Sequence, residues 1–175
     1  MKKDWRYSSY PFMREKSCLV DYEIRTDSLT TSIGAVFPLL TEEEQIVKND
    51  LCMIQPLCYH ANGSVRGKLA IMEDDLQWLS GRYDFYLEQT GDKTKQFVLP
   101  GGKEAACALH SARSEAKKSY RALHKVSEER DVPEILFSFL GLLANVLFAM
   151  AVYINQVNGI SEIPFESKSY PMKRK

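Results

Sequence analysis

The chain has 175 residues, enough for one domain with a sizeable core, and its 26% charged and 45% hydrophobic residues are typical of a globular protein. Its formal net charge is zero, so no overall field draws it to nucleic acid or to an anionic membrane, and any anion site must be a local cluster. Four cysteines without a CxxC pair, and a start without an apolar signal core, indicate reduced thiols, so we expect a cytoplasmic protein.

The spacing of apolar residues predicts an all-α fold of five helices. Residues 1–17 are polar and aromatic, show little periodicity and indicate an N-terminal arm. Residues 18–158 contain the five helices and form one domain, and residues 159–175 indicate a flexible C-terminal tail. No run alternates between polar and apolar residues strongly enough to require a sheet.

Breaker and capping residues predict where the first two helices begin and end. We expect the first helix over residues 20–40, with soft interruptions at Gly34 and Pro38. Residues 41–44 read Thr-Glu-Glu-Glu, a capping box that predicts the start of the second helix. Pro56 lies inside this second helix, where we expect it to introduce a kink.

The third and fourth helices follow two turn-like segments, residues 62–64 and 89–94. An apolar face predicts the third helix and is made of Leu69, Met72, Leu76, Leu79, Tyr83 and Tyr86. The fourth helix is expected from about residue 103 to residue 126. The fifth begins after residues 131–134, with Pro133 in its first turn.

Residues 135–154 of the fifth helix carry no charged side chain, and this run is long enough for a membrane span. The alternative is a central helix that its neighbours bury on every side. Ser138, Gly141 and Asn145 suit close helix packing in either setting. A single span would leave the four amphipathic helices without their central partner, so we expect the buried helix and no membrane partner.

A glycine-rich turn before the fourth helix is the candidate binding feature. Residues 96–102 read Gln-Phe-Val-Leu-Pro-Gly-Gly, and the N-terminus of the next helix points its free N–H groups and positive dipole end toward them. Six basic or titratable side chains follow, four of them spaced every four residues on one helix face: His110, Arg113, Lys117, Lys118, Arg121 and Lys125. The pattern predicts an anion site, for which a solvated charged face is the alternative.

Cys52, Cys58 and His60 are candidate metal ligands by residue type. Their spacing matches no standard zinc pattern, and Cys58 and His60 point to different faces of one helix. We therefore interpret the cysteines as small hydrophobic residues and expect no resident metal site.

Residues 97–121 resemble the signature of the PduO-type ATP:cob(I)alamin adenosyltransferases, in which a Phe-(Ile/Val)-Leu-Pro-Gly/Ser-Gly turn precedes an Ala-Leu-His-x-x-Arg helix and clustered arginines. Residues 26–34, Thr-Asp-Ser-Leu-Thr-Thr-Ser-Ile-Gly, resemble that family's Thr-x-Asp-Glu-Leu-x-x-x-Ile-Gly segment. Residues 139–148 resemble its Phe-Leu-Asn-Arg-Leu-Ser-Asp-x-Leu-Phe helix, and Ile54 and Gln55 match an Ile-Gln in its second helix. Together these matches span about residues 20–157.

The resemblance implies a five-helix bundle that assembles as a trimer, with active sites between subunits. It also implies that ATP binds with Mg²⁺ beside an apolar pocket for cobalamin. In this family Co(I) of the reduced corrinoid attacks the 5′ carbon of ATP, which forms adenosylcobalamin and releases triphosphate. The expected partners are therefore ATP, a corrinoid and further copies of the same chain.

The resemblance also assigns roles to individual residues by position. Phe97 would press on the lower face of the corrin and keep the lower ligand off cobalt, unless it is an ordinary core aromatic. Asp27 and Arg113 would form an ion pair between subunits and are the expected catalytic residues; for Asp27 the alternative is a solvent-facing charge. Lys117 would stand where the family has an arginine that grips the ATP phosphates, keeping the charge but losing the bidentate fork. The other expected cofactor-binding residues are Gly101, Gly102, His110, Lys118, Arg121 and Asn145.

Several family positions are changed. The N-terminal Thr-x-Thr-Gly-Asp-x-Gly-x-Thr loop, which wraps the nucleotide, is absent before Asp27. Tyr120 replaces an acidic residue, and Gly141, Leu142 and Asn145 replace the family's Asn, Arg and Asp. These losses remove several hydrogen bonds, each worth about 0.5–3 kcal/mol. The expected function is a divergent corrinoid adenosyltransferase; the alternatives are a non-catalytic relative that binds corrinoid or nucleotide, and a helical scaffold that has lost both ligands.

Overall fold

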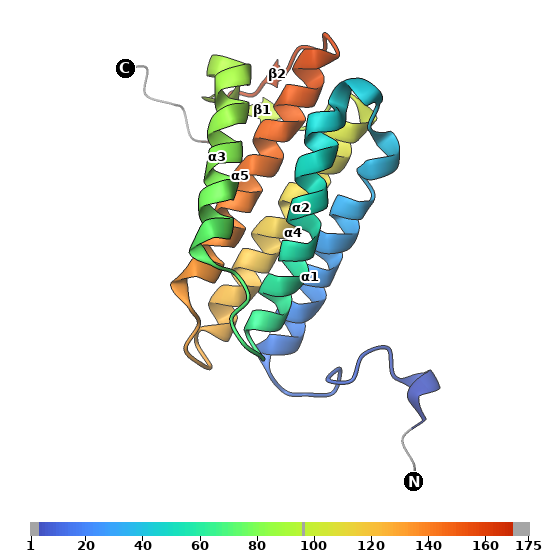
Figure 1. The fold of residues 1–175 in the computed structure, drawn as a ribbon, viewed down its shortest axis with the longest axis vertical. Helices are drawn as coiled ribbons and strands as arrows, with labels where there is room; N and C mark the ends of the chain where they lie inside the picture. Colours follow the sequence, from blue (N-terminus) through green and yellow to red (C-terminus); the bar gives the residue numbers. More distant parts are fainter. Residues whose placement is uncertain (1–3, 96, 170–175) are drawn as a thin grey trace.

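The computed structural model describes residues 4–95 and 97–169. Five α-helices alternate in direction along the long axis of the molecule (Figure 1): α1 (Cys18–Gly34), α2 (Gln45–Ser64), α3 (Glu73–Thr90), α4 (Glu104–Val126) and α5 (Glu134–Val157). Helix α1 packs against α2 and α4, and α5 packs against α4 and α3. The predicted all-α, five-helix fold is confirmed. Residues 1–3 of the predicted arm, Gln96 and residues 170–175 of the predicted tail lie outside the described residues.

The first helix is shorter than predicted. It begins after Ser17, whose hydroxyl accepts a hydrogen bond from the Leu19 N–H at 3.2 Å and caps the helix. It ends at Gly34, and a 3₁₀ turn (Phe37–Leu39) follows instead of the expected continuation to residue 40. Pro38 lies inside that turn and has no N–H for an α-helical hydrogen bond, so the regular helix stops before it.

The start of α2 follows the predicted capping residues, after a short 3₁₀ turn (Glu42–Glu44). The Thr41 N–H donates to Glu44 Oε2 at 2.8 Å, which is the glutamate half of the capping box. Helix α2 continues through Pro56 to Ser64. Helix α3 starts later than predicted, at Glu73, because Asp75 accepts from the Met72 N–H at 2.8 Å and fixes Met72 at the cap position.

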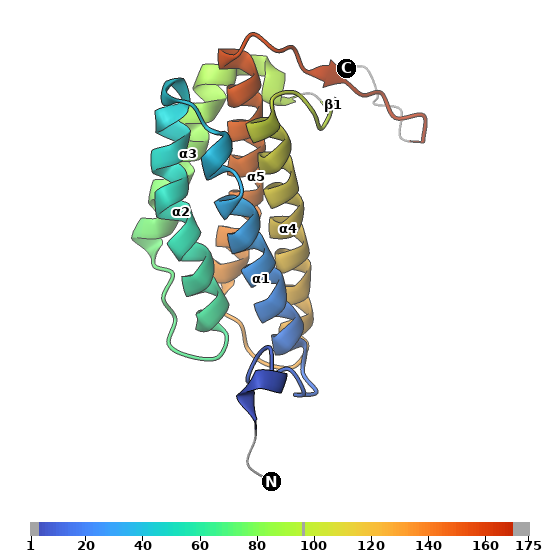
Figure 2. The same cartoon turned by 90° about the vertical axis from the view of Figure 1, so that its right-hand side faces the viewer.

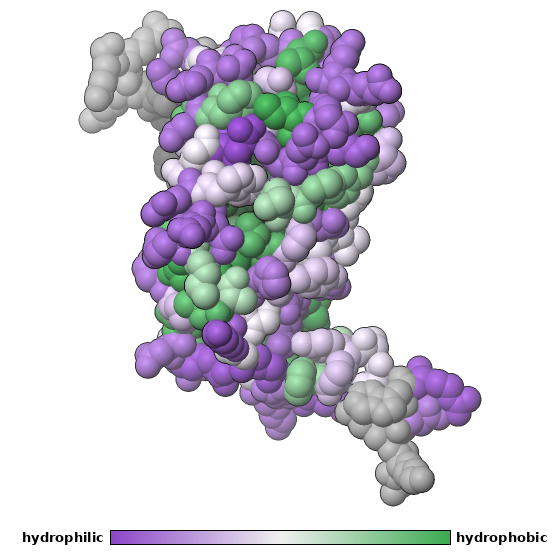
Figure 3. All heavy atoms as spheres, viewed as in Figure 1, coloured by the Kyte–Doolittle hydropathy of each residue, from purple (hydrophilic) through white to green (hydrophobic). Residues whose placement is uncertain are grey.

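Helix α5 is the uncharged helix of the sequence. By length and composition it qualifies as a membrane span, yet 61% of its most apolar window is buried inside the bundle. Its inner face carries most of the large core residues, among them Phe139, Leu143 and Met150. Hydrophilic side chains cover most of the outer surface of the face shared by α2, α3 and α5, with hydrophobic ones between them (Figure 3). The packing identifies α5 as the core helix that was expected.

A small two-stranded ribbon, which the sequence did not predict, lies beside one end of the bundle and projects away from it (Figure 2). Strand β1 (Val98–Leu99) pairs antiparallel with β2 (Ile163–Pro164), so that Leu99 lies opposite Ile163. One further bond, from the Phe165 N–H to the Phe97 carbonyl at 2.8 Å, extends the pairing. Part of the predicted C-terminal tail is therefore paired with the turn before α4.

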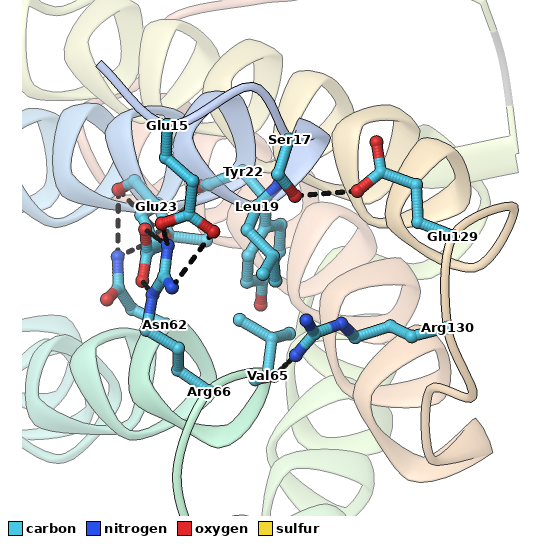
Figure 4. Close-up of polar contacts among 11 residues, drawn as sticks. Glu15, Ser17, Leu19, Tyr22, Glu23, Asn62, Val65, Arg66, Glu129 and Arg130 are labelled. Atoms are coloured by element: carbon cyan, nitrogen blue, oxygen red, sulfur yellow. Dashed lines mark hydrogen bonds and ion pairs between the residues drawn. The ribbon is translucent and has the colours of Figure 1, made fainter. Parts of the chain in front are cut away.

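The N-terminal arm is attached at the opposite end of the bundle (Figures 2 and 4). Glu129, just past α4, accepts from the Ser17 hydroxyl at 2.6 Å and from the Cys18 N–H at 2.9 Å. Arg66, just past α2, pairs with Glu15 at 2.9 Å and with the buried Glu23 at 2.7 Å. These contacts hold the base of the arm against the loops at this end.

Candidate functional site

The Pro-Gly-Gly turn has a conformation that only glycine suits. Gly102 has φ +104°, a region that L-residues with side chains rarely adopt. A Cβ at this position would lie 2.1 Å from Asn155 Oδ1, so a side chain has no space. The second glycine of the motif therefore lets the backbone approach α5 closely and then turn into α4.

The ribbon presents an apolar face to solvent. Successive strand residues point to opposite sides, and Val98 is 8% exposed whereas Phe97 is 73% exposed. Leu99, Ile163 and Phe165 are exposed as well, and the register places them on the same side as Phe97. Phe97 is thus not a core aromatic in this chain. Its ring belongs to an exposed hydrophobic patch, the kind of surface that marks a ligand or partner.

A buried ion pair fastens the start of α4. Lys103 Nζ lies 2.5 Å from Oε1 of the fully buried Glu44, which also accepts from Asn158 Nδ2 at 2.7 Å. Burial raises the pKa of Glu44, but the hydrogen bonds from Lys103, the Thr41 N–H and Asn158 outweigh it and hold the pKa below its usual value. The carboxylate therefore stays charged and links the residue before α4 to the end of α5.

His110 lies beneath the surface of α4 beside Phe148 of α5, with 6.0 Å between the ring centroids. It is 5% exposed, and within the described part of the chain neither ring nitrogen has a hydrogen-bond partner. Burial, and secondarily the charge of Arg113, lower its pKa to about 4, so it is neutral near pH 7. Arg113 Cζ lies 5.2 Å from the centroid of the same Phe148 ring, so the guanidinium of α4 packs over an aromatic ring of α5.

The basic stripe continues along the outer face of α4. Lys117 and Arg121 are exposed, and among residues 4–95 and 97–169 no carboxylate pairs with them or with Arg113. Lys118 differs, because its ammonium lies 2.5 Å from Glu115. Within the described residues these three cations, and Lys125 further along the stripe, have no carboxylate partner, which suits the binding of a polyanion. Asn145 is exposed on α5.

Asp27 is exposed on α1 and is held by a residue that sequence reasoning missed. The Tyr59 hydroxyl, from α2, donates to Asp27 Oδ1 at 2.7 Å, and this bond raises the pKa of Tyr59. No ion pair joins Asp27 to Arg113 within the described chain. The carboxylate keeps further lone pairs free to accept other hydrogen bonds or to meet a cation.

Tyr120 and Gly141, two positions at which this chain differs from the family pattern, lie against each other. The ring of Tyr120 covers Gly141, with Cε2 3.6 Å from the place a Cβ would occupy. Tyr120 also packs edge-on against Phe137 at 5.6 Å between centroids, and both line a hollow of about 420 Å³ between α4 and α5. Tyr120 and Gly141, where the family has an acidic residue and an asparagine, thus meet in one aromatic contact, beside a hollow whose other lining residues are mostly polar, among them His124, Arg130 and Glu134.

A five-helix bundle with this turn and this basic stripe is the arrangement expected of the corrinoid adenosyltransferase class. Residues 12–154 match the family model for cobalamin adenosyltransferase. The corrinoid adenosyltransferase of Bacillus subtilis strain 168 is 25% identical over 147 residues, 80% of this chain and 76% of that protein. The chain belongs to the cobalamin adenosyltransferase family.

Solved structures share the fold. A phenylalanine-to-alanine variant of the PduO-type ATP:corrinoid adenosyltransferase from Lactobacillus reuteri, complexed with cobalamin and ATP, superimposes with a TM-score of 0.79 at 23% identity, over 87% of this chain and 88% of that one. An arginine-to-lysine variant of the L. reuteri enzyme, complexed with ATP, gives a TM-score of 0.80 at 24% identity, over 86% and 89%.

Proposed function

We propose that this protein transfers the 5′-deoxyadenosyl group of ATP to the Co(I) centre of a corrinoid. Co(I) donates its electron pair to the 5′ carbon of ATP, the C5′–O bond breaks, and triphosphate leaves with the bonding electrons. The observation that carries the proposal is the retained turn with Phe97 exposed on it, in a chain of this family. Family membership favours transfer over the alternatives of a non-catalytic binding relative and a scaffold without ligands.

The corrinoid is assigned to the apolar face of the ribbon. Phe97 would lie against the lower face of the corrin, where an aromatic ring excludes water and a lower ligand from cobalt. Gly102, with φ +104°, allows the backbone to turn closely on α5 behind that ring, and Gly101, where a Cβ would meet only the Leu99 carbonyl at 3.9 Å, is a further proposed contact. The protein thereby orients the two substrates and excludes water, while the cobalt supplies the nucleophile.

ATP is assigned to the basic stripe of α4. Among the described residues, Arg113, Lys117 and Arg121 pair with no carboxylate, so a triphosphate would neutralise them. Lys118, beside them on α4, and Asn145, exposed on α5, are further contacts in the proposal. His110 is neutral and 5% exposed, has no hydrogen-bond partner among the described residues, and would lie beneath the site as an uncharged donor.

Mg²⁺ would enter with the nucleotide. Across the described residues, no three His, Cys, Asp or Glu side chains gather where they could hold a metal ion. Mg²⁺ binds readily through substrate phosphates and retains several waters, so the protein need not supply a dedicated cage. In the proposed site Mg²⁺ would balance charge on the leaving triphosphate.

The site is proposed to be completed by a neighbouring subunit in a homotrimer. Asp27 of one chain and Arg113 of another would form the ion pair between subunits, and Tyr59 would hold the carboxylate in place. We also propose a cytoplasmic location, which the four free cysteines support.

The test is to mix the purified protein with ATP, Mg²⁺ and chemically reduced cobalamin and to follow the absorbance spectrum. We expect the alkylcobalt spectrum of adenosylcobalamin and release of triphosphate. A Phe97→Ala variant should form product more slowly, whereas Tyr7→Ala, which changes an exposed aromatic of the arm, should not. Measurable corrinoid binding without any spectral change would contradict transfer.

A further inference from the structure

We propose that Asn155, a residue of α5 remote from the basic stripe, is a positioning residue for the corrinoid half of the site. Its side-chain amide holds the Pro-Gly-Gly turn and the β1–β2 ribbon in the arrangement that presents Phe97. Figure 2 shows the ribbon beside one end of the bundle. The role rests on the function proposed above, because it matters only if Phe97 meets a corrinoid.

Every polar atom of the Asn155 side chain is used. Oδ1 accepts from the Lys103 N–H at 3.0 Å, and Nδ2 donates to the Gly101 carbonyl at 3.0 Å and to Glu162 Oε1 at 2.8 Å. The residue is 1% exposed, so water does not compete for these bonds. Two donors and one acceptor are satisfied at once, which fixes the orientation of the amide.

The three bonds reach the segments that adjoin both strands of the ribbon. Gly101 and Lys103 lie at the end of β1, where the chain enters α4, and Glu162 lies directly before β2. The Phe165 N–H then bonds to the Phe97 carbonyl at 2.8 Å. Asn155 thus joins, from the side of the bundle, the two segments whose pairing sets the position of Phe97.

Gly102 shows how closely the turn is seated on this amide. Its absent Cβ would lie 2.1 Å from Asn155 Oδ1 and 2.4 Å from Nδ2, so the turn is packed directly on the side chain. Replacing Asn155 by aspartate keeps the shape and the acceptor for Lys103. It replaces the donating nitrogen by an oxygen that faces the Gly101 carbonyl and the Glu162 carboxylate, so two attractive contacts become repulsive.

The experiment is a double-mutant cycle on the full chain, with Asn155→Asp, Phe97→Ala and the two combined. We expect Asn155→Asp to lower kcat/KM for cob(I)alamin by about 10- to 100-fold, as small misplacements of reacting groups do, with the KM for ATP unchanged. In the Phe97→Ala background the same substitution should change the rate little, because there is no ring left to position. Equal effects in both backgrounds, or no effect of Asn155→Asp on kcat/KM, would overturn the proposal.

Gln156→Leu is the matched control. Gln156 is the next residue of α5 and also makes two side-chain hydrogen bonds, from Lys93 at 2.8 Å and to the Gln89 carbonyl at 2.7 Å, but it does not touch the turn. The Gln156→Leu variant should lose a comparable free energy of unfolding and keep the wild-type kcat/KM for cob(I)alamin. A fall in kcat/KM equal to that of Asn155→Asp would mean that general loosening of the helix end, and not positioning, explains the effect.

Two measurements separate this proposal from the proposed function. If Asn155→Asp does not fold, Glu162→Leu removes one of the three bonds and should shift kcat/KM in the same direction, and an unchanged value would overturn the role. Hydrogen–deuterium exchange of residues 97–103 and 163–165 gives a readout without catalysis. A wild-type protein that forms no product defeats the proposed function, whereas unchanged exchange in these segments of Asn155→Asp defeats the positioning role.

Discussion

Two glycines near the site meet opposite surroundings, and this difference predicts opposite responses to alanine. At Gly102 a Cβ meets Asn155 at 2.1 Å and the backbone has φ +104°, so we expect Gly102→Ala to cost about 2–3 kcal/mol and to displace the turn. At Gly141 a Cβ would rest in ordinary contact on Tyr120, and alanine should stabilise α5 by about 0.5–1 kcal/mol. Urea unfolding of both variants checks this, and shifts of the same sign would contradict it.

His110 predicts a pH dependence of stability. Its pKa is about 4 in the folded chain and near 6.5 when unfolded, so between these values the unfolded state binds the proton and the folded state does not. The contribution of His110 to the free energy of unfolding is fully present above about pH 6.5, and it falls by roughly 2–3 kcal/mol as the pH drops to about 4.

The measurement is the free energy of unfolding from urea titrations at about pH 7 and about pH 5. Glu44, whose pKa is lowered, contributes stability above its unfolded value near 4.5 and loses it only at lower pH, outside this window. We expect His110→Leu to flatten the curve between the two pH values. A slope that persists in this variant would assign the titration to another group.

At the scale of elements, the spacing of apolar residues in the sequence was enough to predict that the five helices exist. Each helix carries its own apolar stripe and local breakers, so α4 and α5 were placed to within a residue or two at each end. The ribbon could not be found in this way. Each strand has two residues, too few to show alternation, and the strands are separated by α4 and α5 along the chain.

The same reasoning explains which candidate site residues the sequence could propose. The turn and the basic stripe are local patterns, and their residues lie where the pattern puts them. Asn155 and Tyr59 act through partners on other elements, and neither has a local signal beyond being polar or aromatic. An asparagine at the end of an uncharged helix was the one available hint, since buried polar groups in such a helix require partners.

The attachment of the arm predicts a clear difference between two arginines. Arg66 neutralises Glu23, which is 4% exposed, and stacks 4.0 Å from the ring centroid of Phe12. Arg66→Met leaves that carboxylate buried without its partner, so we expect a loss of about 2–4 kcal/mol and faster proteolysis of the arm. Arg6→Met breaks an exposed pair with Asp4, which water and salt screen, and should leave the free energy of unfolding almost unchanged. Equal losses in unfolding titrations would show that the arm does not depend on Arg66.

Across the whole molecule, the arm and the turn lie at opposite ends of the bundle (Figures 1 and 2). Within one chain the described part of the arm, residues 4–17, therefore lies away from the ribbon. Among the described residues, Arg113, Lys117 and Arg121 form no ion pair with a carboxylate, and Asp27 forms none with a cation. The unpaired cations and the unpaired carboxylate could meet if subunits associate. Assembly is therefore the property that links the two halves of the proposed site.

The proposed trimer is tested by a second double-mutant cycle. Asp27→Asn and Arg113→Met should each weaken association by about 2 kcal/mol or more, because each leaves the other charge at an interface without its partner. The double variant should be no weaker than the weaker single variant, since the two residues form one interaction. Asp21→Asn, an exposed carboxylate on the same helix, should leave assembly unchanged. Sedimentation velocity over a range of concentrations measures this, and additive losses in the double variant would mean that Asp27 and Arg113 do not meet.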